Sequence, residues 1–334
     1  MSLLDRERIK LNTLQQRIQP ALARFEEEFA AVMDGGTPLI QDICQHLLKG
    51  KSKRFRPTLL LISAQHADDV DPLAITAAAC VELVHTATLI HDDFIDTALT
   101  RRGLPTINGA WGGSAALIMG DLLYSKALDV LCQNGQYFAV DMMAHTTWLM
   151  SQAEMLQLEL KYDLKITRDQ YMMIIYQKTA SLIETSCRIG AHFNPLAKGH
   201  EDAYGEFGRK LGLVFQITDD IFDYLGDERR LGKPTGQDWE EGRITLPLIS
   251  ALEKAPPGRR REIIDIAAHS NDKHRSAAWP EVKRFVDDFG GVEDAFSVAH
   301  HCGAEAKEAL EPVVSGTQKD MLAVAVEYVI NRLH

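Results

Sequence analysis

Apolar residues recur at intervals of three and four along most of the chain, which is the spacing of an amphipathic α-helix. The pattern predicts helices over residues 4–32, 38–49, 57–66, 72–97, 114–133, 137–163, 168–189, 200–224 and 245–254, and several more up to the C-terminus. No segment has the two-residue alternation of a convincing β-strand. We therefore expect an all-α fold.

The breaks between these segments contain residues that start helices. Asp71 precedes Pro72, so that an N-cap acceptor is followed by a residue suited to the first helical turn. Thr167 and Gln170 have the spacing of a capping box. Residues 225–242 are polar and rich in glycine, and a loop of this length commonly has a function of its own. We predict helix starts near 72 and 168 and a lid over 225–242.

The composition narrows the class of protein. The chain has 334 residues, 46% of them apolar and 25% charged, which is the composition of a globular protein with a large core. Its net charge of −11 would repel nucleic-acid phosphates, so nucleic acid is not expected as a partner. The five cysteines lie far apart without a C-x-x-C pair, which fits reduced thiols and gives no zinc signature.

Nothing in the sequence favours export or a membrane span. The first residues carry alternating charges and lack the apolar segment of a signal peptide. The longest apolar run, residues 75–90, is interrupted by Glu82 and His85 and falls short of the ~20 residues that cross a bilayer. We expect a cytoplasmic protein without a transmembrane segment.

The pattern D-D-x-x-D occurs twice, each time at the end of an apolar helical stretch. The residues are Asp92, Asp93, Asp96, Asp219, Asp220 and Asp223. At ~100° per residue, the three carboxylates of a motif fall on one side of the helix within one turn. Oxygen ligands without cysteine suit Mg²⁺, which binds one or two carboxylates, water and phosphates. One such motif is more commonly a solvated acidic face, but two on facing helices would line one cavity and bind a polyphosphate through Mg²⁺.

Basic residues lie near both motifs in the sequence. They are Lys49, Lys51, Lys53, Arg54 and Arg56 before the first motif, Arg101 and Arg102 after it, and Lys178, Lys233 and Arg243 around the second. In an acidic chain, this distribution indicates that they neutralise a bound anion. Taken alone, residues 49–56 also fit a solvated loop or a patch for an anionic membrane, and Arg101 and Arg102 fit a helix C-terminus.

These strings resemble the trans-isoprenyl diphosphate synthases, or polyprenyl synthetases, and within them the long-chain branch such as octaprenyl diphosphate synthase. The matching strings are KRFRP, ELVHTATLIHDDFIDTALTRRGLPT, GDLLYSKAL, YQKTASL, GLVFQITDDIFDYLGD and LGKPTGQDWEEGRITLPLI, in the family's order over residues 50–250. The remaining C-terminal residues, 258–334, add only helical character.

The resemblance implies one all-helical prenyltransferase domain over residues 1–334, a large bundle around a deep central cavity of the isoprenoid synthase type. It implies a transferase that joins isopentenyl diphosphate head-to-tail to an allylic diphosphate such as farnesyl or geranylgeranyl diphosphate. It further implies three Mg²⁺ ions in each active site, with Mn²⁺ as a substitute, and a homodimer. Transient contact with a membrane surface would let the product leave.

The resemblance also implies a role for individual residues. The six motif aspartates would coordinate Mg²⁺ on the allylic diphosphate, and Arg101, Lys178, Lys233 and Arg243 would hold the same diphosphate. Lys53, Arg56, His85 and Arg102 would hold isopentenyl diphosphate without a metal. Lys178, Thr179 and Gln216 would line the reacting region, where oxygen dipoles stabilise positive charge. Taken alone, His85 equally fits a hydrogen-bonded core histidine.

The chain departs from the family pattern at three places. Lys51 and Ser52 stand where Gly-Gly is usual, which affects how the loop backbone approaches a phosphate. Arg243 stands where lysine is common, and a planar guanidinium is not equivalent to a lysine at a phosphate. Trp239 stands where leucine is common.

Helix geometry bears on the length of the product. Each residue before Asp92 lies ~1.5 Å further along the helix, so Ala87 would lie about 7.5 Å and Val84 about 12 Å down the cavity wall. Short-chain members often have an aromatic residue where this chain has Ala87, and neither Ala87 nor Thr88 would block a growing tail. This favours a long-chain product, hexaprenyl to octaprenyl or longer. Met143 and Trp148 are candidates for the floor of the cavity, although ordinary core packing explains them equally well.

Three other functions stay open at this point. The first is a short-chain synthase that makes farnesyl or geranylgeranyl diphosphate. The second is an HD-type metal phosphohydrolase, suggested by His91 and Asp92, which would need further histidine ligands. The third is a non-catalytic subunit of a heteromeric prenyltransferase, although such subunits typically lose one of the two motifs.

Overall fold

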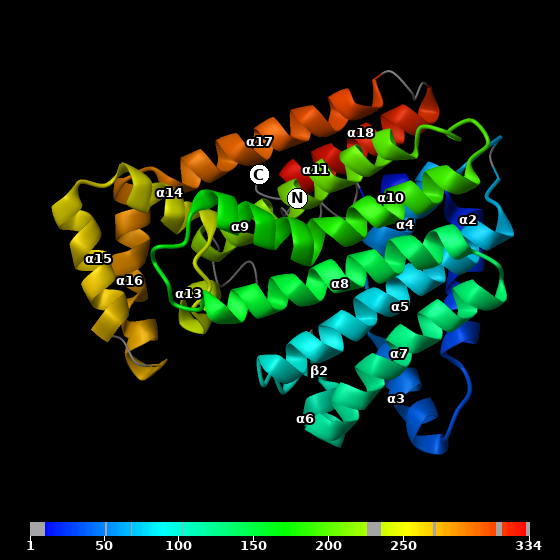
Figure 1. Ribbon diagram of the computed structural model, residues 1–334, viewed down its shortest axis with the longest axis horizontal. Helices are drawn as coiled ribbons and strands as arrows, with labels where there is room; N and C mark the ends of the chain where they lie inside the picture. Colours follow the sequence, from blue (N-terminus) through cyan, green and yellow to red (C-terminus); the bar gives the residue numbers. More distant parts are fainter. Residues whose placement is uncertain are drawn as a thin grey trace.

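Helices make up most of the described chain, as the hydrophobic pattern predicted (Figure 1). The computed structural model describes residues 11–50, 52–67, 69–101, 103–225, 235–269, 272–311 and 316–331. The predicted all-α class is confirmed. The described strands are β1 (Thr100–Arg101) and β2 (Leu104–Pro105), which form a short antiparallel hairpin that the search for alternation missed.

The N-terminal part of the chain, which contains the first aspartate motif, begins with a helical stretch over residues 11–17. It continues with α2 (Gln19–Met33), α3 (Pro38–Lys49), α4 (Phe55–Ala64), α5 (Pro72–Ile95), α6 (Ile107–Trp111) and α7 (Gly113–Gln133). The middle of the chain forms α8 (Tyr137–Glu159), α9 (Arg168–Ile175), the π-helix η1 (Tyr176–Ala180), α10 (Ser181–Phe193) and α11 (Glu201–Leu225). The C-terminal part forms α13 (Gln237–Glu241), α14 (Leu246–Lys254), α15 (Pro257–His269), α16 (Asp272–Asp288), α17 (Gly291–Leu310) and α18 (Thr317–Ile330).

Two neighbouring groups of long helices position the site. One group contains α5, which packs against α7, α2 and α4, and the other contains α11, which packs against α10 and α17. The helices α9, η1 and α10 follow one another along the length of the molecule, beside α8 (Figure 1). One connected cluster of buried apolar side chains runs from Leu11 to Ile330.

The helix α5 is buried on most of its surface. Its residues from Ala74 to Val84 are buried because α2, α4, α7 and α10 pack around them. Among the described helices, α5 alone is long and apolar enough to cross a membrane, but 72% of its apolar window is buried inside the molecule. Such burial is typical of a core helix.

The predicted helix starts are confirmed. The Asp71 carboxylate accepts a hydrogen bond from the Leu73 amide at 2.8 Å, and Pro72 occupies the first helical turn of α5. Thr167 and Gln170 form the expected capping box at α9.

The predicted lid is only partly described, since residues 226–234 lie outside the described residues. Its last part is not a loop, because residues 237–241 form α13. This helix is held by tertiary contacts: Trp239 is buried, and its indole N–H donates to the Arg275 carbonyl at 3.0 Å. Five residues are too few for periodicity to reveal a helix.

Candidate active site

The two aspartate motifs lie at the C-terminal ends of α5 and α11 and approach each other across a cavity. Asp92 and Asp96 from α5 and Asp220 from α11 line this space, which measures about 270 Å³. Arg101, Lys178 and Arg243 also line this cavity, as do Thr179 and Gln216. The structure thus brings both motifs and three of the predicted basic residues to one place.

A second, larger cavity of about 630 Å³ adjoins the first and shares Asp92, Lys178, Thr179 and Gln216 with it. Lys53, Arg56, His85 and Asp219 line its polar part. Its apolar part is lined by Leu117, Tyr124, Met150, Met155, Leu158 and Phe215. This space therefore offers both charged and hydrocarbon-like walls.

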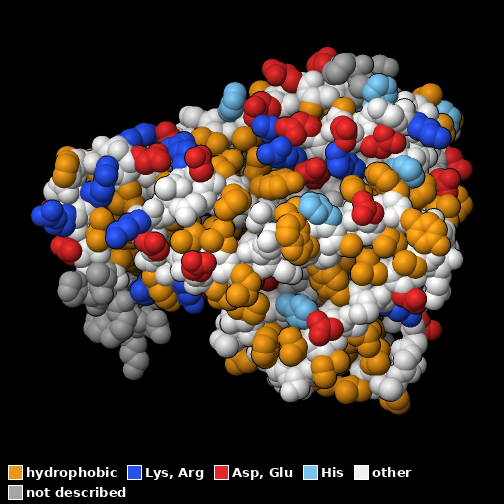
Figure 2. Space-filling model, in the orientation of Figure 1, with side chains coloured by type: hydrophobic (Ala, Val, Ile, Leu, Met, Phe, Trp, Pro, Cys, Tyr) orange, Lys and Arg blue, Asp and Glu red, His pale blue; other side chains and the backbone are white. Residues whose placement is uncertain are grey.

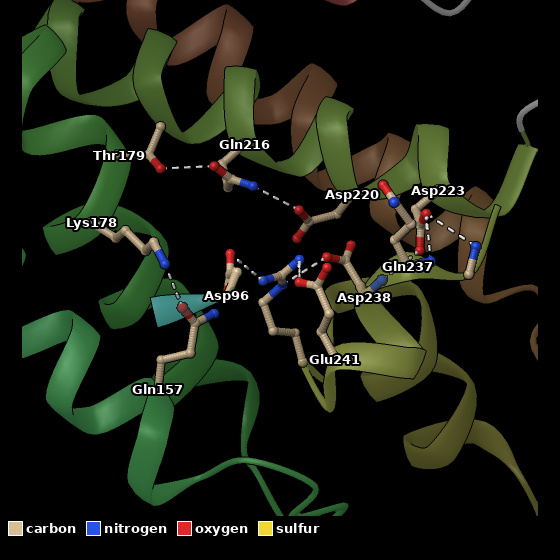
Figure 3. Close-up of polar contacts among 12 residues, drawn as sticks. Asp96, Gln157, Lys178, Thr179, Gln216, Asp220, Asp223, Gln237, Asp238 and Glu241 are labelled. Carbon is tan, nitrogen blue, oxygen red and sulfur yellow. Dashed lines mark hydrogen bonds and ion pairs between the residues drawn. The ribbon is translucent and has the colours of Figure 1, made fainter. Parts of the chain in front are cut away.

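The six aspartates do not all face the cavities, which corrects the expectation from helical spacing. The Asp93 carboxylate is buried and accepts a hydrogen bond from Arg101 Nε at 2.7 Å. Asp223 accepts backbone N–H bonds from Gly236, Gln237 and Asp238, at 3.0 to 3.1 Å (Figure 3). Neither residue lines either cavity, because a guanidinium in one case and the start of α13 in the other hold the carboxylate aside.

Burial makes the cavity-lining carboxylates of Asp92 and Asp220 resist ionisation. Burial raises the pKa of Asp92 to about 6, against the opposing effect of the Lys178 charge. Burial and the nearby Asp238 raise the pKa of Asp220 well above its usual range. Clustered carboxylates that lose water and repel one another bind cations favourably, because a cation removes both penalties.

The donor set fits a hard divalent cation. The cavities present carboxylate, amide and hydroxyl oxygens, which are the ligands that Mg²⁺ and Ca²⁺ prefer. Within the described ranges, no group of three or more histidine, cysteine or acidic side chains is arranged to hold an ion by itself. Each cation would therefore take its remaining ligands from water or phosphate, as Mg²⁺ commonly does.

A chain of hydrogen bonds links the reacting region to the second motif (Figure 3). The Thr179 hydroxyl donates to Gln216 Oε1 at 2.7 Å, and Gln216 Nε2 donates to Asp220 Oδ1 at 2.8 Å. The Tyr171 hydroxyl donates to the other Asp220 oxygen at 2.7 Å. Thr179 lies in the π-helix η1, a form that is rare and frequent at functional sites. Tyr171 was missed by sequence reasoning, since a tyrosine in an apolar helix gives no separate signal.

Lys178 has two partners on α8 that the sequence analysis also missed. Its ammonium group donates to Gln157 Oε1 at 2.6 Å (Figure 3). The same group lies 2.6 Å from Glu154 Oε2. Glu154 and Gln157 are separated by one helical turn, so their side chains share a face. The spacing E-x-x-Q was the available signal, but nothing in the sequence tied it to Lys178.

Arg243 lies among acidic side chains of both halves of the site. Its Nε donates to Asp238 Oδ1 at 2.9 Å, its Nη2 pairs with Glu241, and its Nη1 lies 3.9 Å from Asp96 Oδ2 (Figure 3). These charges raise the pKa of the guanidinium above its usual range although burial opposes the rise. Arg243 thus connects α13 to the first motif.

The residues predicted to hold isopentenyl diphosphate partly come together. Arg56 Nη1 lies 3.1 Å from His85 Nε2, and the Arg56 Nε is buried without a hydrogen-bond partner in the described part of the chain. Lys53 is exposed, with its ammonium group 6.0 Å from the centre of the Tyr328 ring. The buried Nε of Arg56 is therefore a donor suited to an anion. Arg102 and Lys233 lie outside the described residues.

Of the residues predicted to form the chain-length wall, one lines the larger cavity and the others do not. Thr88 lines the larger cavity, whereas Ala87, Val84 and Met143 are fully buried and are not among its lining residues. Trp148 is exposed and lies in a shallow groove on the outer face of α8. Ala87 is rotated by ~140° from Asp92 around the helix, which explains its placement. Tyr124 and Met150, from α7 and α8, face the cavity instead.

Comparison with known proteins gives consistent relatives. Residues 37–282 match the family model for polyprenyl synthetases. A short chain isoprenyl diphosphate synthase from Methanothermobacter thermautotrophicus is 34% identical over 294 residues, which are 87% of this chain and 89% of that protein.

Solved structures agree with this. A decaprenyl diphosphate synthase from Rhodobacter capsulatus has a TM-score of 0.88 at 28% identity, covering 97% of this chain and 99% of that one. A polyprenyl synthase from Caulobacter crescentus, complexed with calcium and isoprenyl diphosphate, has a TM-score of 0.86 at 26% identity, covering 96% and 97%. The protein belongs to the polyprenyl synthetase family, and is thus a transferase of the prenyl diphosphate synthase type.

Proposed function

We propose that this enzyme condenses isopentenyl diphosphate head-to-tail with an allylic diphosphate, with Mg²⁺ as its metal. The observation that carries the proposal is the approach of Asp92, Asp96 and Asp220 across a space that also contains Lys178 and Arg243. Anionic and cationic groups in one cavity suit a diphosphate bound together with metal ions. We further propose three ions at each site, with Mn²⁺ as a substitute.

In this proposal, Arg101, Lys178 and Arg243 hold the allylic diphosphate, and Lys53, Arg56 and His85 hold isopentenyl diphosphate. When bound, the metal neutralises charge on the leaving diphosphate. The allylic C–O bond breaks, the allylic carbon bonds to the isopentenyl double bond, and the proton that is then lost goes to the departed diphosphate. In this proposal, the oxygens of Thr179 and Gln216 stabilise the cation and Leu89 helps to exclude water, since all three residues line both cavities.

We propose a long-chain product, because Thr88, one of the α5 side chains that line the cavity before Asp92, is too small to block a growing tail. The apolar part of the cavity continues to Met155 and Leu158, which reach the surface. A short-chain product is the second candidate: Tyr124 extends into the cavity from α7, and one relative is named a short-chain synthase.

The phosphohydrolase reading finds no support. His91 Nε2 lies 3.1 Å from the Leu117 carbonyl and 3.5 Å from Asp121, so the imidazole is held by α7 rather than by further histidines. Family membership also favours prenyl transfer.

The test is to incubate the purified chain with Mg²⁺, labelled isopentenyl diphosphate and farnesyl diphosphate, and to size the products. We expect chain extension that EDTA abolishes. Asp92→Asn should lower kcat by roughly 10²-fold or more, whereas Asp93→Asn should lower it less, because Asp93 faces Arg101 rather than the cavity. Absence of extension by the chain alone would overturn the proposal in favour of a subunit that needs a partner.

A further inference from the structure

Arg54 stands between two residues assigned to isopentenyl diphosphate, yet its guanidinium is occupied elsewhere. Its Nε and Nη2 donate to the two carboxylate oxygens of Glu26 at 2.9 and 3.0 Å. Its Nη1 donates to Glu82 Oε1 at 2.9 Å. Because all three guanidinium nitrogens are held by carboxylates, Arg54 is poorly placed to bind a diphosphate itself.

The surroundings hold the guanidinium in place. The Arg54 side chain is 13% exposed and that of Glu82 is 3% exposed. The guanidinium carbon lies 4.5 Å from the centre of the Phe29 ring and 5.6 Å from that of Phe25, both on α2. This combination of a two-pronged ion pair, a buried counterion and a cation–π contact is stronger than a surface salt bridge.

The backbone around Arg54 is also held. Arg54 has a φ of 50°, in the left-handed region that residues with a side chain adopt only when their surroundings impose it. The Ser52 hydroxyl donates to Glu82 Oε1 at 2.9 Å and accepts the Arg54 amide N–H at 3.3 Å. Gln15, from the first helical stretch, donates to the Lys53 carbonyl at 3.0 Å. Three consecutive residues, 52–54, are therefore fixed from outside the loop.

The same face of α5 connects this cluster to the substrate residues. Glu82 lies one helical turn before His85, and His85 contacts Arg56. Glu82, His85, Lys53 and Arg56 all line the larger cavity. A shift of Arg54 would therefore move Lys53 and Arg56, which flank it in the chain, relative to His85.

We propose that Arg54 is a positioning residue whose guanidinium, held by Glu26 and Phe29 of α2 and by Glu82 of α5, sets the loop so that Lys53 and Arg56 can bind isopentenyl diphosphate. The inference rests on the proposed function, in which those residues bind that substrate. It gives a role in substrate binding to α2, which lies outside residues 37–282 that match the family model. Ser52, where glycine is usual in the family, takes part through its hydroxyl.

The decisive variant is Glu82→Gln, assayed by steady-state kinetics with each substrate varied in turn. If Arg54 positions the loop, KM for isopentenyl diphosphate should rise roughly tenfold, with kcat and KM for the allylic substrate changed less than about twofold. If Arg54 instead binds the diphosphate, removing its counterion frees the guanidinium, so an unchanged or lower KM would overturn the proposal.

A second variant, at the surface, keeps the proposal testable if Glu82→Gln does not fold. Glu26 is 47% exposed, so Glu26→Gln should fold normally and still raise KM for isopentenyl diphosphate several-fold. Glu27→Gln is the matched control, because it makes the same charge change on the same helix at an exposed residue that has no ion pair within the described ranges. Arg54→Lys should restore part of the affinity lost in Arg54→Met, since it keeps the charge but not the fork.

The remaining outcomes are also informative. Wild-type KM values in both glutamate variants, or equal effects of Glu26→Gln and Glu27→Gln, would refute the positioning role. If kcat and Tm fall together in the glutamate variants, the ion pairs of Arg54 only stabilise the fold, and the positioning role is likewise refuted. A wild-type chain that neither extends farnesyl diphosphate nor binds isopentenyl diphosphate in calorimetry would refute the proposed function itself, and the inference with it.

Discussion

The motif aspartates differ in what holds their carboxylates. Arg101 donates to the Asp93 carboxylate and backbone amides donate to that of Asp223, so these two residues organise the hairpin and the start of α13. Asp220 accepts hydrogen bonds from Tyr171 and Gln216 and still lines the cavity. Asp92 and Asp96 line it from α5. Identical residue types in one short motif thus divide between shaping the site and facing it.

At the neighbouring positions 87 and 88 of α5, the structure predicts different effects of a substitution by phenylalanine. Thr88 lines the larger cavity, so Thr88→Phe should shorten the main product with little change in stability. Ala87 is fully buried, so Ala87→Phe should overpack the core and lower the free energy of unfolding by about 1–3 kcal/mol. Product sizing and urea denaturation of both variants check this. A shorter product from a stable Ala87→Phe enzyme would contradict the assignment.

Among elements, the start of α17 is tied to two other helices through one carboxylate. Asp294 accepts hydrogen bonds from Arg168 of α9 and from Ser250 of α14 at 2.8 Å each, and lies 3.0 Å from Lys254 Nζ. Burial by itself raises the pKa of Asp294, but the bonds from Lys254, Ser250 and Arg168 outweigh it and lower the pKa to about 2. The contact joins the C-terminal helices to the helix that leads into η1.

Because the pKa of Asp294 differs between the folded and the unfolded chain, the free energy of unfolding depends on pH. In the unfolded chain an aspartate has a pKa of about 3.9, so the unfolded state takes up the proton first as the pH falls. The stability that Asp294 contributes is therefore complete above about pH 5 and is lost as the pH falls toward 2. Asp294→Asn should cost about 2 kcal/mol at pH 7 and less at acidic pH.

Urea denaturation of wild type and Asp294→Asn across this pH range measures the difference directly. Glu293→Gln, an exposed acid in the same first turn of α17, serves as the control and should differ little from wild type. A constant difference between wild type and Asp294→Asn at every pH would contradict the assigned pKa.

On the scale of the whole molecule, an exposed apolar face lies over α7 and α8. Its members are Leu117, Ile118, Trp148, Met155 and Leu158. Figure 2 shows hydrophobic side chains gathered over these helices on the viewed face. Met155 and Leu158 also line the larger cavity, so the face continues into the site. We propose that a second copy of the chain covers it, since exposed apolar patches mark interaction sites.

A charged residue in this face should therefore dissociate the dimer. Met155 is 68% exposed, so Met155→Glu should leave the fold intact and halve the mass measured by sedimentation. Leu196→Glu, at a residue 75% exposed in the turn before α11, is the control and should remain dimeric. A wild-type chain that sediments as a monomer would refute the proposal.

Periodicity located the helices and residue types located the chemistry, because both are local properties of the chain. The predicted starts at Pro72 and Arg168 were confirmed because caps act through neighbouring residues. The sequence also determined which carboxylates and cations were candidates for a diphosphate site, through the two motifs and the basic residues around them.

Only the tertiary structure decided how these groups are used. It decided that Asp93 faces Arg101, that Glu154 pairs with Lys178, and that Arg54 is held by Glu26 and Glu82. It also decided that Thr88 rather than Ala87 faces the cavity. These choices depend on contacts between residues far apart in the chain, where a side chain turns toward whichever charge or space the packing of helices brings to it.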